Sequence, residues 1–192
     1  GKFVMGILFP VGLILVILMK TELFTGNMLL TIPLVNKKIK LTGMLKNWLW
    51  VYIGNFVGSL LIALAVYYAG NVSNNIDLFN KFASIANLKV SFTFIDAVIL
   101  GIFCNILVCI AVYLAFINKN TLEKIVVIFL PIMFFIIMGF EHSVANMFYL
   151  SMGYLTDKIT IFDGLIHNLL PVTIGNIIGG CLVALFVNMK EK

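Results

Sequence analysis

The residues best suited to proton and hydrogen-bond chemistry are the adjacent Glu141 and His142. They stand between an apolar run at residues 125–138 and a shorter one at residues 147–150. Neither run alone reaches the roughly 20 apolar residues that cross a bilayer, whereas together they do. Ionisable side chains at such depth are costly and mark a pathway or a relay. Non-helical backbone is tolerated there only where it is buried in protein or lines a cavity.

A second polar break repeats this spacing earlier in the chain. Both Glu22-Leu-Phe-Thr-Gly-Asn27 and Glu141-His-Ser-Val-Ala-Asn146 place an asparagine after a glutamate and four further residues. Each copy continues to an Ile-Gly-Asn string, which ends at Asn55 in the first copy and at Asn176 in the second. An odd number of crossings between equivalent elements predicts an inverted repeat, and broken helices of this kind are where transporters bind their substrates.

The composition excludes an ordinary soluble domain. The 192 residues are 62% hydrophobic and 11% charged, with a mean hydropathy of +1.12, which indicates an all-α polytopic membrane protein. The net charge of +5 comes from lysines spread over loops and ends, a pattern that suits orientation in a membrane and not nucleic-acid binding. Three cysteines lie in apolar runs and are expected to be buried thiols, not disulfides: Cys104, Cys109 and Cys181.

Apolar runs predict the elements that position the two breaks. The crossings are expected at residues 3–19 continued by 28–35, then 48–69, 90–117, 125–150 and 169–187. The second crossing has aromatic pairs at its ends, which are typical of interfacial belts: Trp48, Trp50, Tyr67 and Tyr68. A basic loop with Lys46 precedes this crossing, a polar loop at 70–88 has room for a surface helix, and residues 155–166 are expected at the interface.

The repeat also predicts the domain organisation. Residues 1–192 form a single transmembrane domain, with a first repeat at 1–69 and a second at 90–189. The second repeat has a full helix at 90–117 before its broken helix, and the first has no such partner. The expectation is a 3+3 architecture whose first helix precedes Gly1.

Lysine counts predict the orientation of this domain. One side is expected to hold Lys37, Lys38, Lys40, Lys46, Lys119, Lys124, Lys190 and Lys192. The other side holds Lys2, Lys81, Lys89 and Lys158. Because cytoplasmic loops carry the excess of lysine, the C-terminus is expected in the cytoplasm.

Four strings in one order resemble the formate/nitrite transporter family, which also contains hydrosulfide channels. They are Glu22-Leu-Phe-Thr-Gly-Asn27, Gly101-Ile-Phe-Cys-Asn105-Ile-Leu-Val-Cys109, Gly139-Phe-Glu-His-Ser-Val-Ala-Asn-Met147 and Asn168-Leu-Leu-Pro-Val-Thr-Ile-Gly-Asn-Ile-Ile-Gly-Gly180. The resemblance implies a homopentamer of aquaporin-like protomers in the cell membrane. It implies a channel for formate or, alternatively, nitrite or hydrosulfide, with no cofactor and no enzymatic activity.

The resemblance further implies a role for each site residue. His142 matches the central pore histidine, Thr25 the threonine of the first break that approaches it, and Lys89 a lysine near the external entrance. Asn105 matches a pore-lining asparagine, and Asn176 is a weaker pore candidate. The cytoplasmic constriction is matched by Phe9, Leu13, Leu23 and Phe24, and the external one by Val108 and Phe135.

The resemblance implies a path with two apolar gates, although by composition alone the Phe and Leu residues assigned to them look like core packing. A bare anion in a dry constriction suffers a large desolvation penalty that a neutral acid avoids. His142 has an unperturbed pKa of about 6.5, and it donates either a proton or only a hydrogen bond to an anion between the gates. Lys89 and half-helix N-termini at Asn27 and Asn146 concentrate anions. Glu141 is expected to order its break by accepting backbone N–H groups, and Glu22, Asn27 and Asn146 are further candidates for ordering the two breaks.

Other interpretations of these residues remain open at this point. His142 is alternatively a buried structural histidine, and Lys89 a snorkelling lysine at the interface. A third interpretation is an intramembrane metalloenzyme that uses Glu141, His142 and cysteines. Zinc requires three or four convergent ligands, whereas Cys104 and Cys109 lie on different helix faces, so no metal site is expected.

Overall fold

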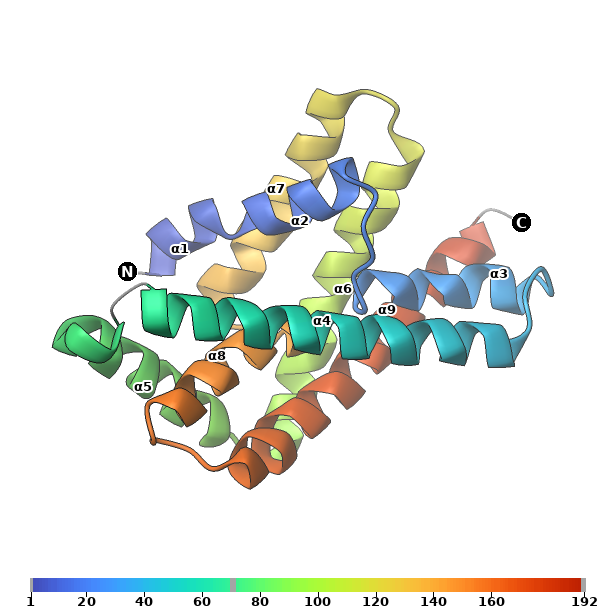
Figure 1. Cartoon of the computed structure of the whole chain (residues 1–192). Helices are drawn as coiled ribbons and strands as arrows, with labels where there is room; N and C mark the ends of the chain where they lie inside the picture. Colours follow the sequence, from blue (N-terminus) through green and yellow to red (C-terminus); the bar gives the residue numbers. More distant parts are fainter. Residues whose placement is uncertain (1, 70–71, 191–192) are drawn as a thin grey trace.

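The computed structural model describes residues 2–69 and 72–190, without the side chains of Lys2 and Ser73. The described part is helical and contains no strand (Figure 1). Its elements are α1 (Lys2–Leu8), α2 (Pro10–Leu18), η1 (Gly26–Leu30), α3 (Thr31–Val35), α4 (Leu41–Ala69), η2 (Val72–Asn74), α5 (Ile76–Val90), α6 (Phe94–Ile117), α7 (Thr121–Met138), α8 (Ser143–Leu155), η3 (Asp163–Leu169) and α9 (Leu170–Lys190).

The expected membrane architecture is confirmed. Among the described residues, four helices are long and apolar enough to cross a bilayer: α4, α6, α7 and the continuous η3–α9 helix, with mean hydropathies of 2.0 to 2.7. Shorter apolar helices at Phe3–Leu18 and Gly26–Val35 are joined by the first break, which Figure 1 shows beside α4. Large apolar side chains such as Leu61 and Phe103 are exposed on the outer faces, where lipid is their natural solvent.

Close contact between α6 and α9 forms the centre of the fold. A Cβ added to Gly101 would lie 2.8 Å from the carbonyl oxygen of Val172, and one added to Gly175 or Gly179 would collide with carbonyls of α6. Small residues let two membrane helices approach in this way. Gly54 and Gly58, the equivalent glycines of α4, meet no described atom within 4 Å of an added Cβ.

The second break is short and has local causes. Gly139 ends α7 in the left-handed region, with φ 75°, a conformation that glycine adopts without steric cost. His142 then caps α8, which begins at Ser143. The half-helix N-terminus therefore lies at His142 and not at the predicted Asn146. In the first break η1 begins at Gly26, one residue before the predicted Asn27.

Several predicted boundaries were wrong by up to seven residues. The second crossing starts at Leu41 instead of 48, so Lys46 lies in α4 and not in a loop. The third crossing starts at Phe94 instead of 90. The preceding helix α5 continues to Val90, two residues past the expected end of the polar loop at 88. The last starts at Asp163 instead of 169, because η3 continues into α9 without interruption.

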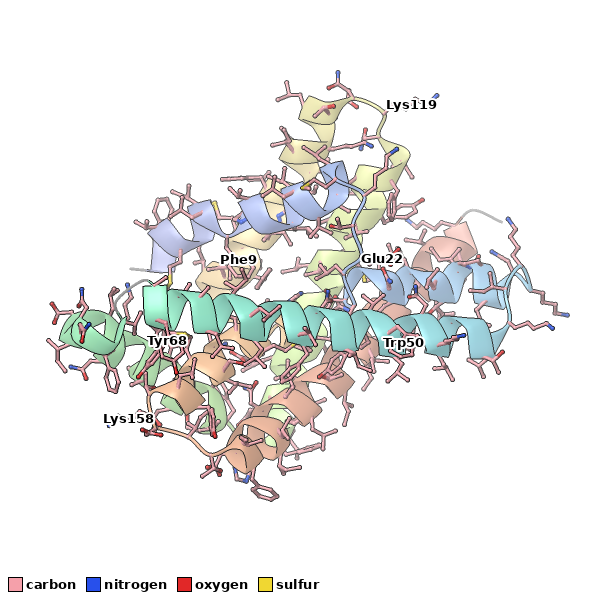
Figure 2. All side chains as sticks on the ribbon, viewed as in Figure 1. Phe9, Glu22, Trp50, Tyr68, Lys119 and Lys158 are labelled. Atoms are coloured by element: carbon pink, nitrogen blue, oxygen red, sulfur yellow. The ribbon has the colours of Figure 1, made fainter. Side chains whose placement is uncertain are left out.

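The aromatic residues of α4 that were expected in an interfacial belt differ in their exposure. Trp48 is 9% exposed, and its indole N–H donates to the carbonyl of Asn27 at 2.9 Å. Trp50 and Tyr68 are 62% and 67% exposed, and Figure 2 shows them toward opposite ends of α4. Trp48 is thus a support of the first break, and Trp50 and Tyr68 are the candidates for an interfacial belt.

Candidate functional site

The second break is held open by one asparagine of α9. The Asn176 amide oxygen accepts the backbone N–H of Ser143 at 2.9 Å, and its amide nitrogen donates to the carbonyl of Glu141 at 3.0 Å. The same nitrogen donates to the carbonyl of Gly101 on α6 at 2.8 Å. Asn176 thus supplies partners to backbone groups that the break leaves without helical ones.

The first break has the same hydrogen bonds. The Asn55 amide oxygen accepts the backbone N–H of Phe24 at 3.0 Å, and its nitrogen donates to the carbonyl of Glu22 at 3.3 Å. In both breaks, the donor to the asparagine is the second residue after the glutamate. This agreement shows that the repeat inferred from sequence spacing extends to individual bonds.

A buried cluster behind the second break contains the ion pair of the site. Glu141 lies 2.7 Å from the ammonium of Lys89 and accepts the amide of Asn146, also at 2.7 Å. Asn146 also donates to Asn168 at 2.7 Å. The side chains of Lys89 and Glu141 are 15% and 4% exposed. Lys89 is therefore not simply a snorkelling lysine; it neutralises a buried carboxylate.

The equivalent cluster of the first break contains a residue that the sequence analysis missed. Asn27 donates to the carboxylate of Glu22 at 2.5 Å and to Asn47 at 2.8 Å. Asn47 precedes Asn55 by the same interval as Asn168 precedes Asn176. That spacing is the signal that would have identified Asn47.

His142 is held at both ring nitrogens. Nδ1 accepts the backbone N–H of Ala145 at 3.1 Å, and Nε2 lies 2.9 Å from the hydroxyl oxygen of Thr25. Because Nδ1 is an acceptor, the neutral ring carries its hydrogen on Nε2. The ring also stacks on Phe135, with centroids 6.1 Å apart and planes at 19°. His142 therefore presents an N–H donor in a fixed direction.

A cavity of about 640 Å³ reaches this histidine. Its walls include most of the apolar residues that the resemblance assigns to constrictions: Phe9, Leu13, Leu23, Val108 and Phe135. Glu22, Asn55 and Tyr149 contribute polar or amphipathic groups. The structure thus brings His142 together with five of the six expected gate residues.

The remaining expected site residues lie outside the lining of this cavity. Phe24 is 4% exposed and packs edge-on against Tyr52, with ring centroids 4.7 Å apart. Asn105 donates to the carbonyls of Thr25 and Asn176, at 3.2 and 2.6 Å. The other residues outside the lining are Thr25, Lys89, Asn176, Asn27, Glu141 and Asn146. Their contacts stabilise the two breaks on the side that does not face the cavity.

Two residues that the resemblance assigns to opposite constrictions touch each other. The rings of Phe9 and Phe135 meet edge to face, with centroids 5.5 Å apart and planes at 86°. Phe9 lies between α1 and α2, and Phe135 lies in the last turn of α7. This contact joins the two broken helices on the wall of the cavity.

The metalloenzyme interpretation gains no support from side-chain geometry. Within residues 2–69 and 72–190, no three His, Cys, Asp or Glu side chains converge as metal ligands. Glu141 is instead occupied by Lys89 and Asn146.

Comparisons with known proteins agree with this architecture. The profile of the formate/nitrite transporter family matches residues 1–189. Formate channel FocA of Haemophilus influenzae is 35% identical over 201 residues, which cover 94% of this chain and 71% of that protein. Formate channel BtFdhC of Bacillus thuringiensis is 43% identical over 176 residues, covering 91% and 67%. A solved pentameric formate channel with formate bound superposes with a TM-score of 0.82 at 30% identity, covering 99% of this chain and 81% of that one. These similar proteins are channels and not enzymes. The fold, the paired breaks and the similarities together show that the chain belongs to the formate/nitrite transporter family.

Proposed function

We propose that this protein is a channel for small monovalent anions of weak acids, with formate as the first substrate to test. The observation that carries the proposal is His142, an N–H donor fixed at the wall of an apolar cavity between two broken helices. The similar proteins named as formate channels support formate, and nitrite and hydrosulfide are the alternatives within the family.

The cavity walls explain why such a path would favour a weak acid. Apolar side chains replace little of an anion's hydration, so a bare anion meets a large desolvation penalty. The Nε2–H of His142 offers one strong donor where that penalty is greatest. An anion that bonds to it must share or replace the hydroxyl of Thr25, which lies 2.9 Å away.

We assign Phe9 to the same constriction as Phe135, because their rings are in contact. Leu13 and Leu23 then remain as candidates for the opposite constriction, whereas the buried Phe24 supports the break behind it. Under this assignment the His142 donor lies beside Phe135, the residue on which its ring stacks.

The proposal includes proton transfer from His142 to the passing anion. A protonated ring passes its Nε2 proton to formate, which leaves as formic acid while the ring becomes neutral. After that step the remaining ring hydrogen is on Nδ1. There it faces the backbone N–H of Ala145, which is also a donor, so the hydrogen bond between them cannot form. Proton transfer therefore requires the α8 cap to open and reform in each cycle, whereas simple hydrogen-bond donation does not.

The assembly and orientation of the protein complete the proposal. We infer a homopentamer in the plasma membrane, supported by the similar pentameric formate channel. Asn36 donates to Asn188 at 2.6 Å, so the turn that carries Lys37 and Lys38 lies beside the C-terminal end of α9. Lysine enrichment at this end supports a cytoplasmic C-terminus. Lys192, which was counted on this side, lies outside the described residues.

Uptake by proteoliposomes tests the proposed function. Purified protein is reconstituted, and the influx of formate, nitrite and hydrosulfide is measured against protein-free vesicles. We expect saturable or channel-like flux of at least one of the three, and much lower flux of acetate. Equal leak with and without protein for all three anions would overturn the proposal.

A further inference from the structure

The carbonyl oxygen of Thr25 receives two hydrogen bonds from the same face of α6. The amide of Asn105 donates at 3.2 Å and the thiol of Cys109 at 3.3 Å. These donors are four residues apart, so they stand one above the other on the helix surface. Asn105, Cys109 and Thr25 are all fully buried. Two side-chain donors of α6 therefore converge on this one carbonyl.

The position of this carbonyl controls the hydroxyl that meets His142. Thr25 is the N-cap residue of η1, but its side chain makes no capping bond. Its hydroxyl oxygen lies 2.9 Å from His142 Nε2. Rotation of the Thr25 backbone would move this hydroxyl away from the imidazole. The two donors of α6 oppose such a rotation.

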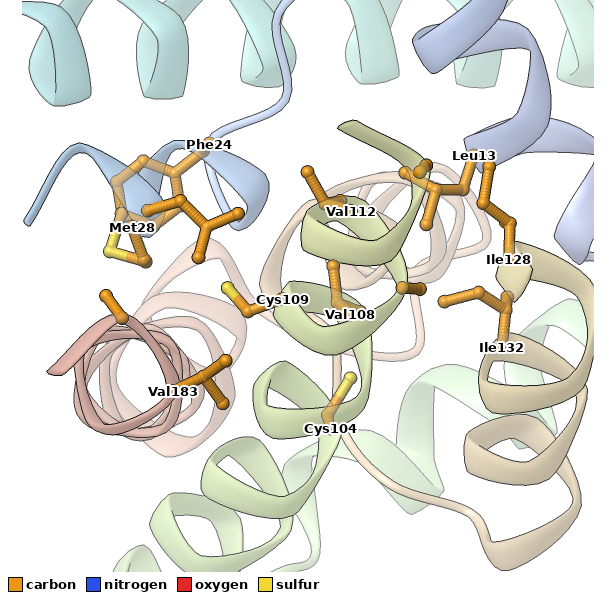
Figure 3. Close-up of a cluster of buried hydrophobic side chains, with 14 of the residues drawn as sticks. Leu13, Phe24, Met28, Cys104, Val108, Cys109, Val112, Ile128, Ile132 and Val183 are labelled. Atoms are coloured by element: carbon orange, nitrogen blue, oxygen red, sulfur yellow. The ribbon is translucent and has the colours of Figure 1, made fainter. Parts of the chain in front are cut away.

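Neighbouring contacts place the first break on the same helix face. A Cβ added to Gly26 would lie 3.5 Å from a methyl group of Val112, which is one turn beyond Cys109. Figure 3 shows Cys109 on the side of α6 that faces Phe24 and Met28. The three positions 105, 109 and 112 thus form a platform for residues 24–26.

We propose that Cys109 is a positioning residue, whose thiol together with the Asn105 amide sets the Thr25 hydroxyl against His142. This inference rests on the proposed function, in which His142 Nε2 meets the anion. A buried thiol most often acts as a small apolar group and a weak donor. Here the thiol is directed at a carbonyl, whereas the equally buried Cys104 of the same helix makes no hydrogen bond to a described residue.

Paired substitutions separate the donor from the volume of the thiol. Cys109→Ala removes the hydrogen bond, and Cys109→Ser keeps a donor in a side chain of similar size. We expect formate flux to fall about two- to fivefold in the alanine variant. This factor corresponds to the lower part of the free-energy range for one neutral hydrogen bond. The serine variant should recover most of this loss. Cys104→Ala is the matched control and should retain wild-type flux.

A double-mutant cycle with Thr25→Val tests whether Cys109 acts through Thr25. If it does, Cys109→Ala should lower flux in the wild type and have little further effect in the valine background. Equal effects in both backgrounds, or equal loss in the alanine and serine variants, would show that Cys109 only fills space. Size-exclusion profiles of all variants establish that each is folded and assembled.

A substrate-independent readout keeps this inference separate from the proposed function. The ¹⁵N chemical shifts of the His142 ring report the hydrogen bonds of Nε2 and Nδ1. Cys109→Ala should move the Nε2 resonance toward its value in Thr25→Val, while Cys104→Ala leaves it unchanged. If the wild type conducts none of the tested anions, the shift still decides the positioning role. An unchanged Nε2 shift in Cys109→Ala would overturn that role.

Discussion

His142 accepts the backbone N–H of Ala145 at 3.1 Å through Nδ1, so the side chain at the cavity is also the N-cap of α8. This bond fixes the tautomer and leaves Nε2–H as the donor. It also couples the charge of the ring to the end of the helix, because a hydrogen on Nδ1 cannot face another N–H group. The same bond therefore constrains both the transport chemistry and the structure of the break.

Replacing His142 by Asn separates these two tasks. Asparagine is a good N-cap residue, so α8 should keep its start, but the side chain cannot titrate. If a proton on His142 drives passage, wild-type formate flux should change over roughly one to two pH units, the range of a titrating imidazole. The variant should lose this dependence. Flux into proteoliposomes is measured between mildly acidic and neutral pH, with correction for external formic acid.

Thr25→Val is the control for this measurement. It removes the hydroxyl that meets Nε2 but leaves the titratable ring, so its defect should be milder and its pH profile retained. An Asn variant with the full wild-type pH profile would show that His142 is not the proton donor. The ring would then act as a hydrogen-bond donor only.

The apolar wall should set both the rate and the selectivity of flux. Phe9 and Leu23 are partly buried and line the cavity. Replacing both by Ala should raise formate flux and admit acetate, because a wider and wetter constriction lowers the desolvation penalty. Leu61→Ala, on an exposed face of α4, is the control. Acetate permeability equal to that of the wild type would contradict the assignment of these residues to gates.

The Lys89–Glu141 pair should be needed for stability as a pair. Removing one partner from a buried ion pair leaves an uncompensated charge and costs about 3–5 kcal/mol. Glu141→Gln and Lys89→Met should each lower the thermal stability of the purified channel. The loss of stability in the double variant should be smaller than the sum of the two single losses. Melting temperatures in detergent give this comparison. Additive losses would indicate that the 2.7 Å contact has no energetic role.

The glycine contact between α6 and α9 makes a sharper prediction about folding. Gly175→Ala places a methyl group against backbone atoms of α6, and such overpacking costs about 1–3 kcal/mol. We expect a lower melting temperature and less assembled protein. Gly43→Ala is the matched control in α4, because no described atom lies within 4 Å of its added Cβ. Wild-type stability of Gly175→Ala would mean that the two helices separate at little cost.

Features that depend on local composition and spacing were predictable from the sequence. Apolar runs identified each crossing, and the Glu-x₄-Asn spacing located both breaks and their equivalence. Errors appeared at helix ends, where single hydrogen bonds decide the boundary. The side chain of Thr93, for example, accepts the N–H of Asp96 and starts α6, so the crossing begins four residues later than its hydropathy indicates.

The assembly of the site was decided by tertiary structure alone. Thr25 and His142 are 117 residues apart in the chain and 2.9 Å apart in space, and Phe9 meets Phe135 across two different broken helices. The apolar character of a residue does not reveal whether it lines a cavity, as Phe9 does, or packs behind it, as Phe24 does. Likewise, the sequence shows that Asn105 and Cys109 share a helix face, but only close packing of that face against the first break directs their donors to the carbonyl of Thr25. Side-chain pattern fixes which face of a helix is buried, whereas the groups that meet across it depend on how whole helices pack.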